Sequence, residues 1–453
     1  MEIITIETAA LGDRSYVLVD GDVAAVIDPQ RDIDRIETVF AERHVRLTHV
    51  FETHIHNDYV TGGLELARRA GAVYVVSASD DVVFERTGAV PGDEFTVGEL
   101  TVKAVGTPGH TPTHLSYVVS RHGEPVAVFT GGSMLFGTVG RTDLISDDVT
   151  DELTRAQFRS VRSLAENLPA DVAVHPTHGF GSFCSAASSS GSDSSTIGQE
   201  RRANLALTLS DEDTFVERLL GGLAAYPRYY AHMAPINRSG PAPVDLSPPE
   251  QVDPAEIRRR IHAGEWVVDL RARTAFARSH LAGTVNLEVG ASFATYLGWT
   301  LPWSTPVTLV GDTADEVTEA QRQMVRIGID RPAGAADGGP AAWAAGGELR
   351  SYRTATFADL AATINADQVV VLDVRRNDEW ALGNIPTAVH IPLHELDARM
   401  DQLPPGELWV HCASGYRAAL AASILDRAGR EVVAIDDDWA NAAEHNALPI
   451  TKH

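Results

Sequence analysis

The stretch Thr53-His54-Ile55-His56-Asn57-Asp58-Tyr59-Val60-Thr61-Gly62-Gly63 decides the fold. It follows an apolar run, 47–51, typical of a buried strand, and precedes a run, 64–71, typical of a short helix closed by glycine. Two histidines and a carboxylate therefore lie in the loop at the carboxyl end of a strand, where rigid scaffolds carry sites. Imidazoles are common metal ligands and Asp58 adds a hard oxygen, so the stretch predicts a metal site.

Two later loops carry histidines in the same setting. Thr107-Pro108-Gly109-His110 and His175-Pro176-Thr177-His178 each follow an apolar, strand-like run. A single H-x-H loop is more often an exposed polar turn than a metal site, but three such loops favour the metal. The motifs T-H-x-H-x-D and P-G-H-T, followed by a further loop histidine, resemble the metallo-β-lactamase superfamily. That resemblance implies an α/β fold, an αββα sandwich of two sheets with helices outside.

Size and charge narrow the class of protein. A chain of 453 residues holds two to four domains, and 44% hydrophobic with 22% charged residues is typical of a globular protein. The formal charge of −25 argues against nucleic acid and anionic membrane surfaces as partners. We expect small-molecule substrates, and a homo-oligomer is left open.

Cysteine content and the N-terminus indicate the compartment. Only Cys184 and Cys412 are present, far apart in sequence, so a disulfide framework is not expected. Residues 1–7 alternate like a strand and lack the pattern of a signal peptide, and no run reaches the length of a membrane-spanning helix. We expect a cytoplasmic protein.

The first domain is predicted over residues 1–240. Apolar runs with intervening turns predict a series of strands up to residue 129, and 147–168 predicts a long helix. The serine-rich stretch Ser185–Ser195 predicts a flexible loop or lid, and 196–209 and 211–220 predict helices. Residues 239–254 contain five prolines and predict a linker.

Beyond the linker the sequence contains an internal repeat. Val267-Val268-Asp269-Leu270-Arg271 matches Val371-Leu372-Asp373-Val374-Arg375 at an offset of 104, and 308–312 matches 408–412 at an offset of 100. This alignment places Asp312 at the position of Cys412. We therefore expect two α/β domains, over residues 250–347 and 353–453.

The second repeat carries the loop Cys412-Ala413-Ser414-Gly415-Tyr416-Arg417 between a strand and a helix. A cysteine there faces the backbone N–H groups of the helix N-terminus, which favour the thiolate and would hold an anionic persulfide. A buried structural cysteine is the alternative. Cys412 is the predicted nucleophile, and Gly415 and Arg417 are predicted to bind the substrate sulfur.

This repeat resembles the rhodanese (sulfurtransferase) family. The supporting residues are Asp373-Val374-Arg375, Glu379-Trp380, Gly383-Asn384-Ile385-Pro386 and the loop 412–417. Four residues between Cys and Arg favour sulfur transfer over the phosphate chemistry of the longer phosphatase loop. Asn384 stands where the family usually has histidine. The first repeat has no cysteine in this loop and resembles inactive rhodanese domains.

A metallo-β-lactamase domain fused to rhodanese repeats resembles the persulfide dioxygenase fusions. Gly140-Arg141-Thr142-Asp143 and Gly181-Ser182-Phe183-Cys184 are similar to that group. The resemblance implies oxidation of a low-molecular-weight thiol persulfide by O2 at Fe(II), with sulfite as product and thiosulfate as a related sulfur compound. It makes Arg141 a predicted contact for an anionic substrate. A two-histidine, one-carboxylate iron site suits such chemistry.

The sequence departs from this pattern at two positions. The carboxylate ligand of a T-G-D motif is replaced by Gly132, and the usual D-H is Asp58-Tyr59. His54, His56 and His110 remain and resemble catalytic zinc ligation, so Zn(II) is the alternative to Fe(II). From sequence, Gly132→Asp is expected to complete an iron site. The candidates for an additional metal ligand are Asp58, Asp143, His178 and Cys184.

Two rival functions stay open at this point. The first is a zinc thioesterase similar to glyoxalase II, in which a metal-activated water attacks a thioester. The second is a non-catalytic first domain, with only the rhodanese active. Cys184 likewise has two interpretations, a buried small side chain or a second sulfur carrier near the metal.

Overall fold

The computed structural model describes residues 1–186, 192–364, 369–444 and 448–452. Residues 187–191 of the predicted lid lie outside the described residues. The chain forms two compact units, Met1–Val244 with Val325–Gly328, and Asp245–Met324 with Ile329–His453. The division at 1–240, 250–347 and 353–453 is finer than these units and stays a prediction. Over the described residues, every helix is too short or too polar to cross a membrane.

The first unit contains two six-stranded sheets. The first sheet runs in order β1 (Glu2–Thr8), β2 (Asp13–Asp20), β3 (Val23–Ile27), β4 (Arg46–Phe51), β5 (Val73–Ser77) and β6 (Thr87–Ala89). The second runs β12 (Ser195–Thr196), β11 (Ala173–Pro176), β10 (Glu124–Gly131), β9 (Leu115–Arg121), β8 (Leu100–Gly106) and β7 (Glu94–Val97). A tight turn at residues 21–22 joins β2 to β3 in antiparallel register.

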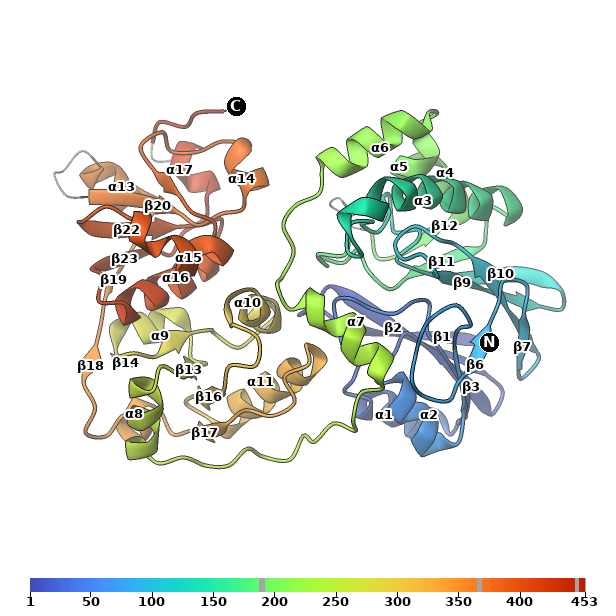
Figure 1. Ribbon diagram of the computed structural model, residues 1–453, viewed down its shortest axis with the longest axis horizontal. Helices are drawn as coiled ribbons and strands as arrows, with labels where there is room; N and C mark the ends of the chain where they lie inside the picture. Colours follow the sequence, from blue (N-terminus) through green and yellow to red (C-terminus); the bar gives the residue numbers. More distant parts are fainter. Residues whose placement is uncertain (187–191, 365–368, 445–447, 453) are drawn as a thin grey trace. The chain divides into compact units, whose positions relative to one another are not determined.

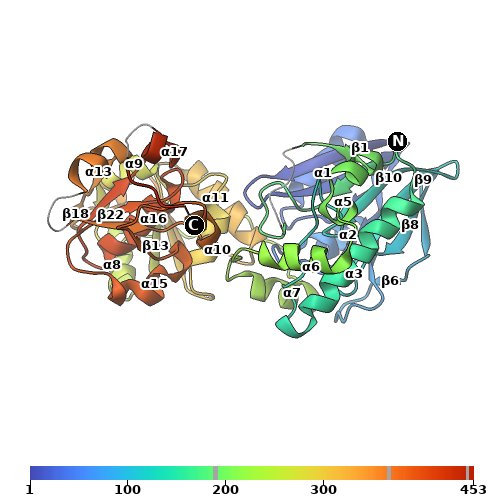
Figure 2. The same cartoon turned by 90° about the horizontal axis from the view of Figure 1, so that it is seen from above.

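Helices cover the outer faces of both sheets (Figure 1). The helices are α1 (Asp34–Arg43), α2 (Gly63–Ala70), α3 (Asp147–Asn167), α4 (Ile197–Ala203), α5 (Leu205–Thr208), α6 (Glu212–Gly221) and α7 (Tyr230–Ser239). The long α3 is prominent in both views (Figure 1, Figure 2). The predicted helix 196–209 is interrupted at Asn204, whose side chain caps α5.

Side-chain alternation in the strands explains this layering. In β2, Tyr16 and Leu18 point into the core between the sheets, while Val17 and Val19 point into the core under α1 and α2. A third core lies between the second sheet and α3, around Phe158. Strands buried on both faces need an apolar centre, which in β2 is the run Tyr16–Val19. The predicted αββα sandwich is therefore confirmed.

The second unit contains two sheets with the same order of parallel strands. The first is β15 (Val285–Asn286), β13 (Trp266–Asp269), β16 (Val307–Val310) and β17 (Gly334–Ala336). The second is β21 (Val389–His390), β20 (Val369–Asp373), β22 (Glu407–His411), β23 (Val432–Ile435) and β19 (Arg353–Ala355). A short pair, β14 (His280–Leu281) with β18 (Leu349–Arg350), accompanies them.

Helices flank both of these sheets. They are α8 (Pro254–His262), α9 (Arg273–Arg278), α10 (Phe293–Thr300), α11 (Ala314–Arg326) and α12 (Pro340–Trp343) in the first copy, and α13 (Phe357–Thr363), α14 (Asn377–Ala381), α15 (Leu396–Arg399), α16 (Tyr416–Arg427) and α17 (Ala440–Glu444) in the second.

The repeat extends to side-chain contacts. Arg271 and Arg375 each bind the aspartate two residues before them with Nη2–Oδ2 distances of 2.6 Å. Asn286 Nδ2 and His390 Nε2 each lie 2.9 Å from the carbonyl oxygen of that arginine. The repeated sheet order and contacts agree with the predicted internal duplication.

Candidate active sites

The histidine loops meet at one edge of the first unit's sheets, inside the protein. His54 and His56 follow β4, His110 follows β8, and His178 follows β11. Each of these four side chains is at most 1% exposed. We call this set the imidazole cluster. Parallel and antiparallel strands that end at one edge explain how residues so far apart in sequence come together.

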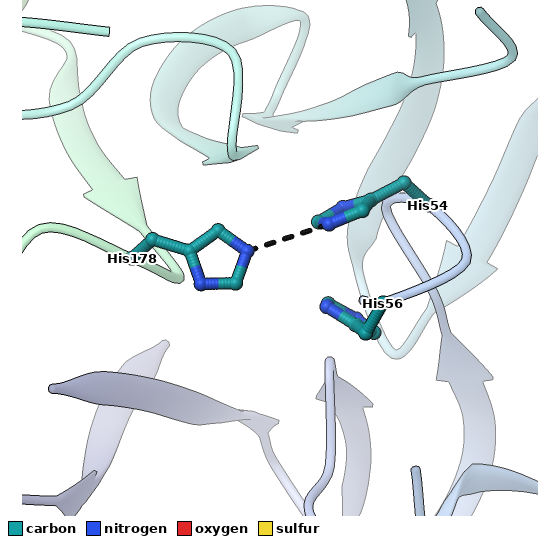
Figure 3. A group of neighbouring side chains, drawn as sticks. All are labelled: His54, His56 and His178. Carbon is teal, nitrogen blue, oxygen red and sulfur yellow. Dashed lines mark hydrogen bonds between the residues drawn. The ribbon is translucent and has the colours of Figure 1, made fainter. Parts of the chain in front are cut away.

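His178 contacts two carboxylates and the ring of His54. Its Nδ1 lies 2.9 Å from Asp13 Oδ1 and 3.1 Å from Asp58 Oδ2, and its Nε2 lies 3.3 Å from His54 Nε2 (Figure 3). Burial alone would lower the pKa of His178, but the two carboxylates raise it well above its ordinary value. The proton that this leaves on Nε2 occupies the place where a metal would bind.

Hydrogen bonds fix the tautomer of His54. The Thr53 hydroxyl donates to Asp28 Oδ2 at 2.7 Å, so its oxygen accepts the Nδ1–H of His54 at 2.8 Å. Burial alone would raise the pKa of Asp28, but the charge of His56 and hydrogen bonds lower it, so it remains an acceptor. The Nε2 lone pair of His54 therefore points at His178, as required of a metal ligand.

His56 is held from one side by carboxylates. Its Nε2 lies 3.0 Å from the Tyr59 hydroxyl and 3.3 Å from both Asp28 Oδ1 and Glu52 Oε2. Burial alone would lower the pKa of His56, but these carboxylates raise it to about 9. Its Nδ1 is buried without a hydrogen-bond partner among the described residues.

His110 is oriented by the backbone. Its Nδ1–H donates to the Arg141 carbonyl at 2.7 Å, while Gln157 Oε1 accepts its main-chain N–H at 2.8 Å. Burial, with the charge of His178, lowers the pKa of His110 to about 3, so the ring is neutral. Its Nε2 is a second buried nitrogen that lacks a partner in the described part of the chain.

These atoms fit a metal ion. Ligand atoms of His54, His56 and His178 lie within 4.8 Å of one another. Two imidazole nitrogens bound to one tetrahedral zinc at about 2.0–2.1 Å stand about 3.3 Å apart, which is the separation of His54 Nε2 from His178 Nε2. Outer hydrogen bonds that orient each ring are typical of metal-binding histidines.

The sequence-predicted ligands divide between two neighbouring groups. His54 and His56 group with His178, whereas His110 groups with His178 and Cys184, again within 4.8 Å. Asp58 groups with Asp13 and His178. His178, which the sequence offered only as an additional ligand, belongs to all three groups. Asp13 was missed, because it lies on β2 without a histidine motif near it.

Arg141 and Asp143 bind each other. The guanidinium is buried and contacts both Asp143 carboxylate oxygens at 2.7 Å, and its remaining N–H groups reach the Phe183 and Ala224 carbonyls. Asp143 is thereby directed to Arg141 and is absent from the metal-ligand groups of the described residues. A role for Arg141 in substrate binding stays a prediction.

Gly132 makes room for His110. A Cβ at residue 132 would lie 2.1 Å from His110 Cδ2 and 2.7 Å from His110 Nε2. The imidazole thus fills the space into which an aspartate at 132 would project. An aspartate at 132 therefore requires the His110 ring to move, and the expectation that Gly132→Asp completes an iron site stays a prediction.

The second unit holds the predicted thiol site. Cys412 is a free cysteine, 2% exposed, directly after β22 and before α16. The first N–H groups of α16 have no partner within the helix and face this loop. We call the loop 412–415 with these N–H groups the anion cradle. Gly415 has a φ of 90°, and a Cβ there would lie 2.3 Å from Asp436 Oδ1, so only glycine fits.

Arg417 is positioned by a residue outside the loop. Its Nη2 lies 2.7 Å from Glu379 Oε1, in a two-pronged ion pair. Glu379 was quoted for the family resemblance but not as a site residue. The ring of Tyr296, from the first copy, lies 5.4 Å from that of Tyr416. Burial raises the pKa of Tyr296. Sequence patterns could not predict this contact between copies.

The hydrogen-bond register corrects the alignment of the two copies. Leu270 N–H binds the Val310 carbonyl as Val374 N–H binds that of His411. Gly338 N–H binds the Asp312 carbonyl as Trp439 N–H binds that of Ala413. Gly311, not Asp312, is therefore the equivalent of Cys412. Apolar strands without alternation do not specify register, which explains the shift of one residue.

A carboxylate fills the corresponding cradle of the first copy. Glu316 Oε2 accepts the N–H groups of Asp312 at 2.7 Å and Thr313 at 3.1 Å. A Cβ at Gly311 would lie 2.7 Å from the same oxygen. This copy therefore has no thiol, and its own carboxylate occupies the loop where an anion would bind.

Two family models match the chain. The metallo-beta-lactamase superfamily matches residues 11–178, and the rhodanese-like domain matches residues 356–445. The human mitochondrial persulfide dioxygenase ETHE1 is 30% identical over 222 residues, which cover 48% of this chain and 76% of that protein. A hydroxyacylglutathione hydrolase of Brucella anthropi is 30% identical over 234 residues, covering 51% and 84%.

A solved structure extends this similarity. The crystal structure of a metallo-beta-lactamase from Staphylococcus aureus subsp. aureus COL is 28% identical, with a TM-score of 0.68. It covers 74% of this chain and 98% of the other. Because the first unit is little more than half of the chain, the similarity includes part of the second unit.

Gly132→Ala tests whether the imidazole cluster needs this glycine. The new Cβ overlaps the His110 ring, and overpacking of this kind costs about 1–3 kcal/mol. We expect a lower melting temperature and loss of metal binding, measured by calorimetry and metal analysis. Gly221→Ala, where a Cβ meets no atom within 4 Å, is the control. Wild-type stability and metal content in Gly132→Ala would contradict the account of His110.

Proposed function

The chain belongs to the metallo-β-lactamase superfamily, in the part that includes persulfide dioxygenases and hydroxyacylglutathione hydrolases, and we propose that it oxidises a thiol persulfide and transfers sulfur. The metal centre is assigned to the imidazole cluster and the sulfur carrier to Cys412. The observation that carries the proposal is the presence of both sites in one chain. A thioesterase has no use for a rhodanese cysteine, whereas persulfide chemistry uses both.

Sulfur transfer follows from the anion cradle. The Cys412 thiolate attacks the outer sulfur of a donor such as thiosulfate, the donor S–S bond breaks, and sulfite leaves. The persulfide that remains on Cys412 is anionic, and the N–H groups of α16 stabilise it. A thiol acceptor then removes the outer sulfur and restores the thiolate. Glu379 holds Arg417 beside this loop.

Glu316 supports this role for the cradle. In the first copy, two loop N–H groups bind a carboxylate at 2.7 and 3.1 Å. The corresponding loop of the second copy has Cys412 in place of Gly311 and Gly415 in place of Ala314. We therefore assign residues 353–453 as the active rhodanese domain and 250–347 as a domain of the same fold without a nucleophile.

The metal chemistry is assigned to the first unit. Bound Fe(II) would supply the one-electron chemistry that lets O2 react with a persulfide, so that O2 and water are consumed and thiol and sulfite are released. His54 and His178 through Nε2 and His56 through Nδ1 would hold the metal, His110 would add Nε2 from the neighbouring group that shares His178, and Asp13, Asp58, Asp28 and Glu52 orient the rings. Burial of the cluster excludes bulk water from the reacting atoms.

The alternative, a zinc thioesterase, is favoured by the hydroxyacylglutathione hydrolase relative. A two-metal form needs a carboxylate at 132 and a histidine at 59. Here the first position is filled by the His110 ring, and the Tyr59 hydroxyl is bound to His56. These two features weigh against the hydrolase and support a single metal.

Metal analysis of protein purified without oxygen tests the centre. We expect stoichiometric iron in the wild-type chain and nearly none in His54→Ala, because a site of few ligands has no spare one. His262→Ala, an exposed histidine at the end of α8, is the control and should keep its metal. Zinc as the native metal would favour the hydrolase. Unchanged metal in His54→Ala would overturn the site assignment, and absence of metal from the wild type would favour a scaffold.

Cys412→Ser tests the sulfur carrier. The hydroxyl stays protonated and cannot hold a sulfane sulfur, so thiosulfate–cyanide sulfurtransferase activity should vanish. The first copy has no thiol to compensate. Metal content should be unchanged, which shows that the variant is folded. Mass spectrometry of the donor-treated wild type should find the added sulfur on Cys412. Sulfur found on Cys184 alone, or activity in Cys412→Ser, would exclude Cys412 as nucleophile.

A further inference from the structure

We propose that the Cys184 thiolate is a metal ligand and supplies to the imidazole cluster the anionic donor that Gly132 cannot. This inference rests on the metal centre of the proposed function and adds a ligand that distinguishes the centre from an all-nitrogen site. Binding breaks the S–H bond, forms a metal–sulfur bond and releases the proton to solvent.

The position of Cys184 supports this assignment. Its side chain is 0% exposed, and its sulfur lies within 4.8 Å of ligand nitrogens of His110 and His178. His110 Nε2 is itself buried without a hydrogen-bond partner among the described residues. Burying a polar atom without a partner costs free energy. A cation bound by both the His110 nitrogen and the Cys184 sulfur would remove this cost.

The backbone of one residue, Arg141, positions both ligands. The Arg141 N–H donates to the Cys184 carbonyl at 2.8 Å, and the Arg141 carbonyl accepts Nδ1–H of His110 at 2.7 Å. The Arg141 side chain also binds the Phe183 carbonyl at 3.1 Å. The loop that carries Cys184 is therefore fixed relative to His110 by direct bonds.

The four nearby carboxylates contact the rings of His178 and His56. Asp13 and Asp58 lie at Nδ1 of His178, and Asp28 and Glu52 lie at Nε2 of His56. In these positions they orient imidazoles from behind. A side chain at residue 132 is excluded by the His110 ring. Asp58 also lies beside the Cys184 thiol, so Cys184 and Asp58 are the two groups of anionic character near the nitrogens of His110 and His178, and Cys184 is the one that groups with both rings.

Thiolate ligation also defines the class of metal. Sulfur with imidazole nitrogen selects zinc, iron or other borderline first-row ions over magnesium and calcium. Because Cys184 lies beside ligand nitrogens of His110 and His178, its sulfur is better suited to ligation than to exchange with dissolved persulfides. That exchange is left to Cys412.

Cobalt substitution of the full chain provides a direct readout. A thiolate bound to Co(II) gives a near-ultraviolet charge-transfer absorption that imidazole and carboxylate ligands do not give. We expect this band in the Co(II)-loaded wild type and in Cys412→Ser, the matched variant at the other cysteine. We expect it to be absent from Cys184→Ser, with Co(II) affinity lower by at least about tenfold.

The outcomes separate this inference from the metal centre itself. Co(II) bound by the wild type without the band, or a band retained in Cys184→Ser, would overturn the thiolate ligand and leave the histidine centre standing. The wild-type spectrum decides the question even if Cys184→Ser fails to fold. A wild-type chain that binds no Co(II) would overturn both the centre and this ligand.

Discussion

The contact on which the first site depends is the one between His178 and two buried carboxylates. Asp13 and Asp58 hold Nδ1 of this imidazole, so Nε2 is directed at His54 at 3.3 Å. His178 also belongs to the group that contains His110 and Cys184. A cation near its Nε2 would take the place of the proton that this nitrogen shares with His54 in a region closed to water. Without a cation, protons on the buried imidazoles balance the charge of the nearby carboxylates.

The second site uses a different source of charge stabilisation. Cys412 lies at the N-terminus of α16, where backbone N–H groups rather than a metal favour a negative charge. The loop of the first copy also binds an anion. It has Gly311 in place of cysteine, and the Glu316 carboxylate accepts hydrogen bonds from its N–H groups. Anion binding is thus a property of the loop backbone, and the side chain at its first position determines whether it carries sulfur.

The sequence predicted the elements that local patterns encode. Histidines at strand ends identified His54, His56 and His110, and the strand–Cys–helix pattern identified Cys412. It could not rank His178 above the other candidates, because that ranking depends on Asp13, which lies on a distant strand. It missed the exclusion at Gly132, which depends on the His110 ring. It aligned Asp312 with Cys412, because buried parallel strands lack the alternation that fixes register.

Persulfide-dependent oxygen consumption tests the central claim most directly. The whole chain, purified without oxygen, is mixed with a low-molecular-weight thiol persulfide while O2 uptake and sulfite are followed together. The account predicts O2 uptake with sulfite formation in proportion to bound iron, and retention of both when Cys412 is replaced by serine. Iron-loaded protein that neither consumes O2 nor forms sulfite would contradict it.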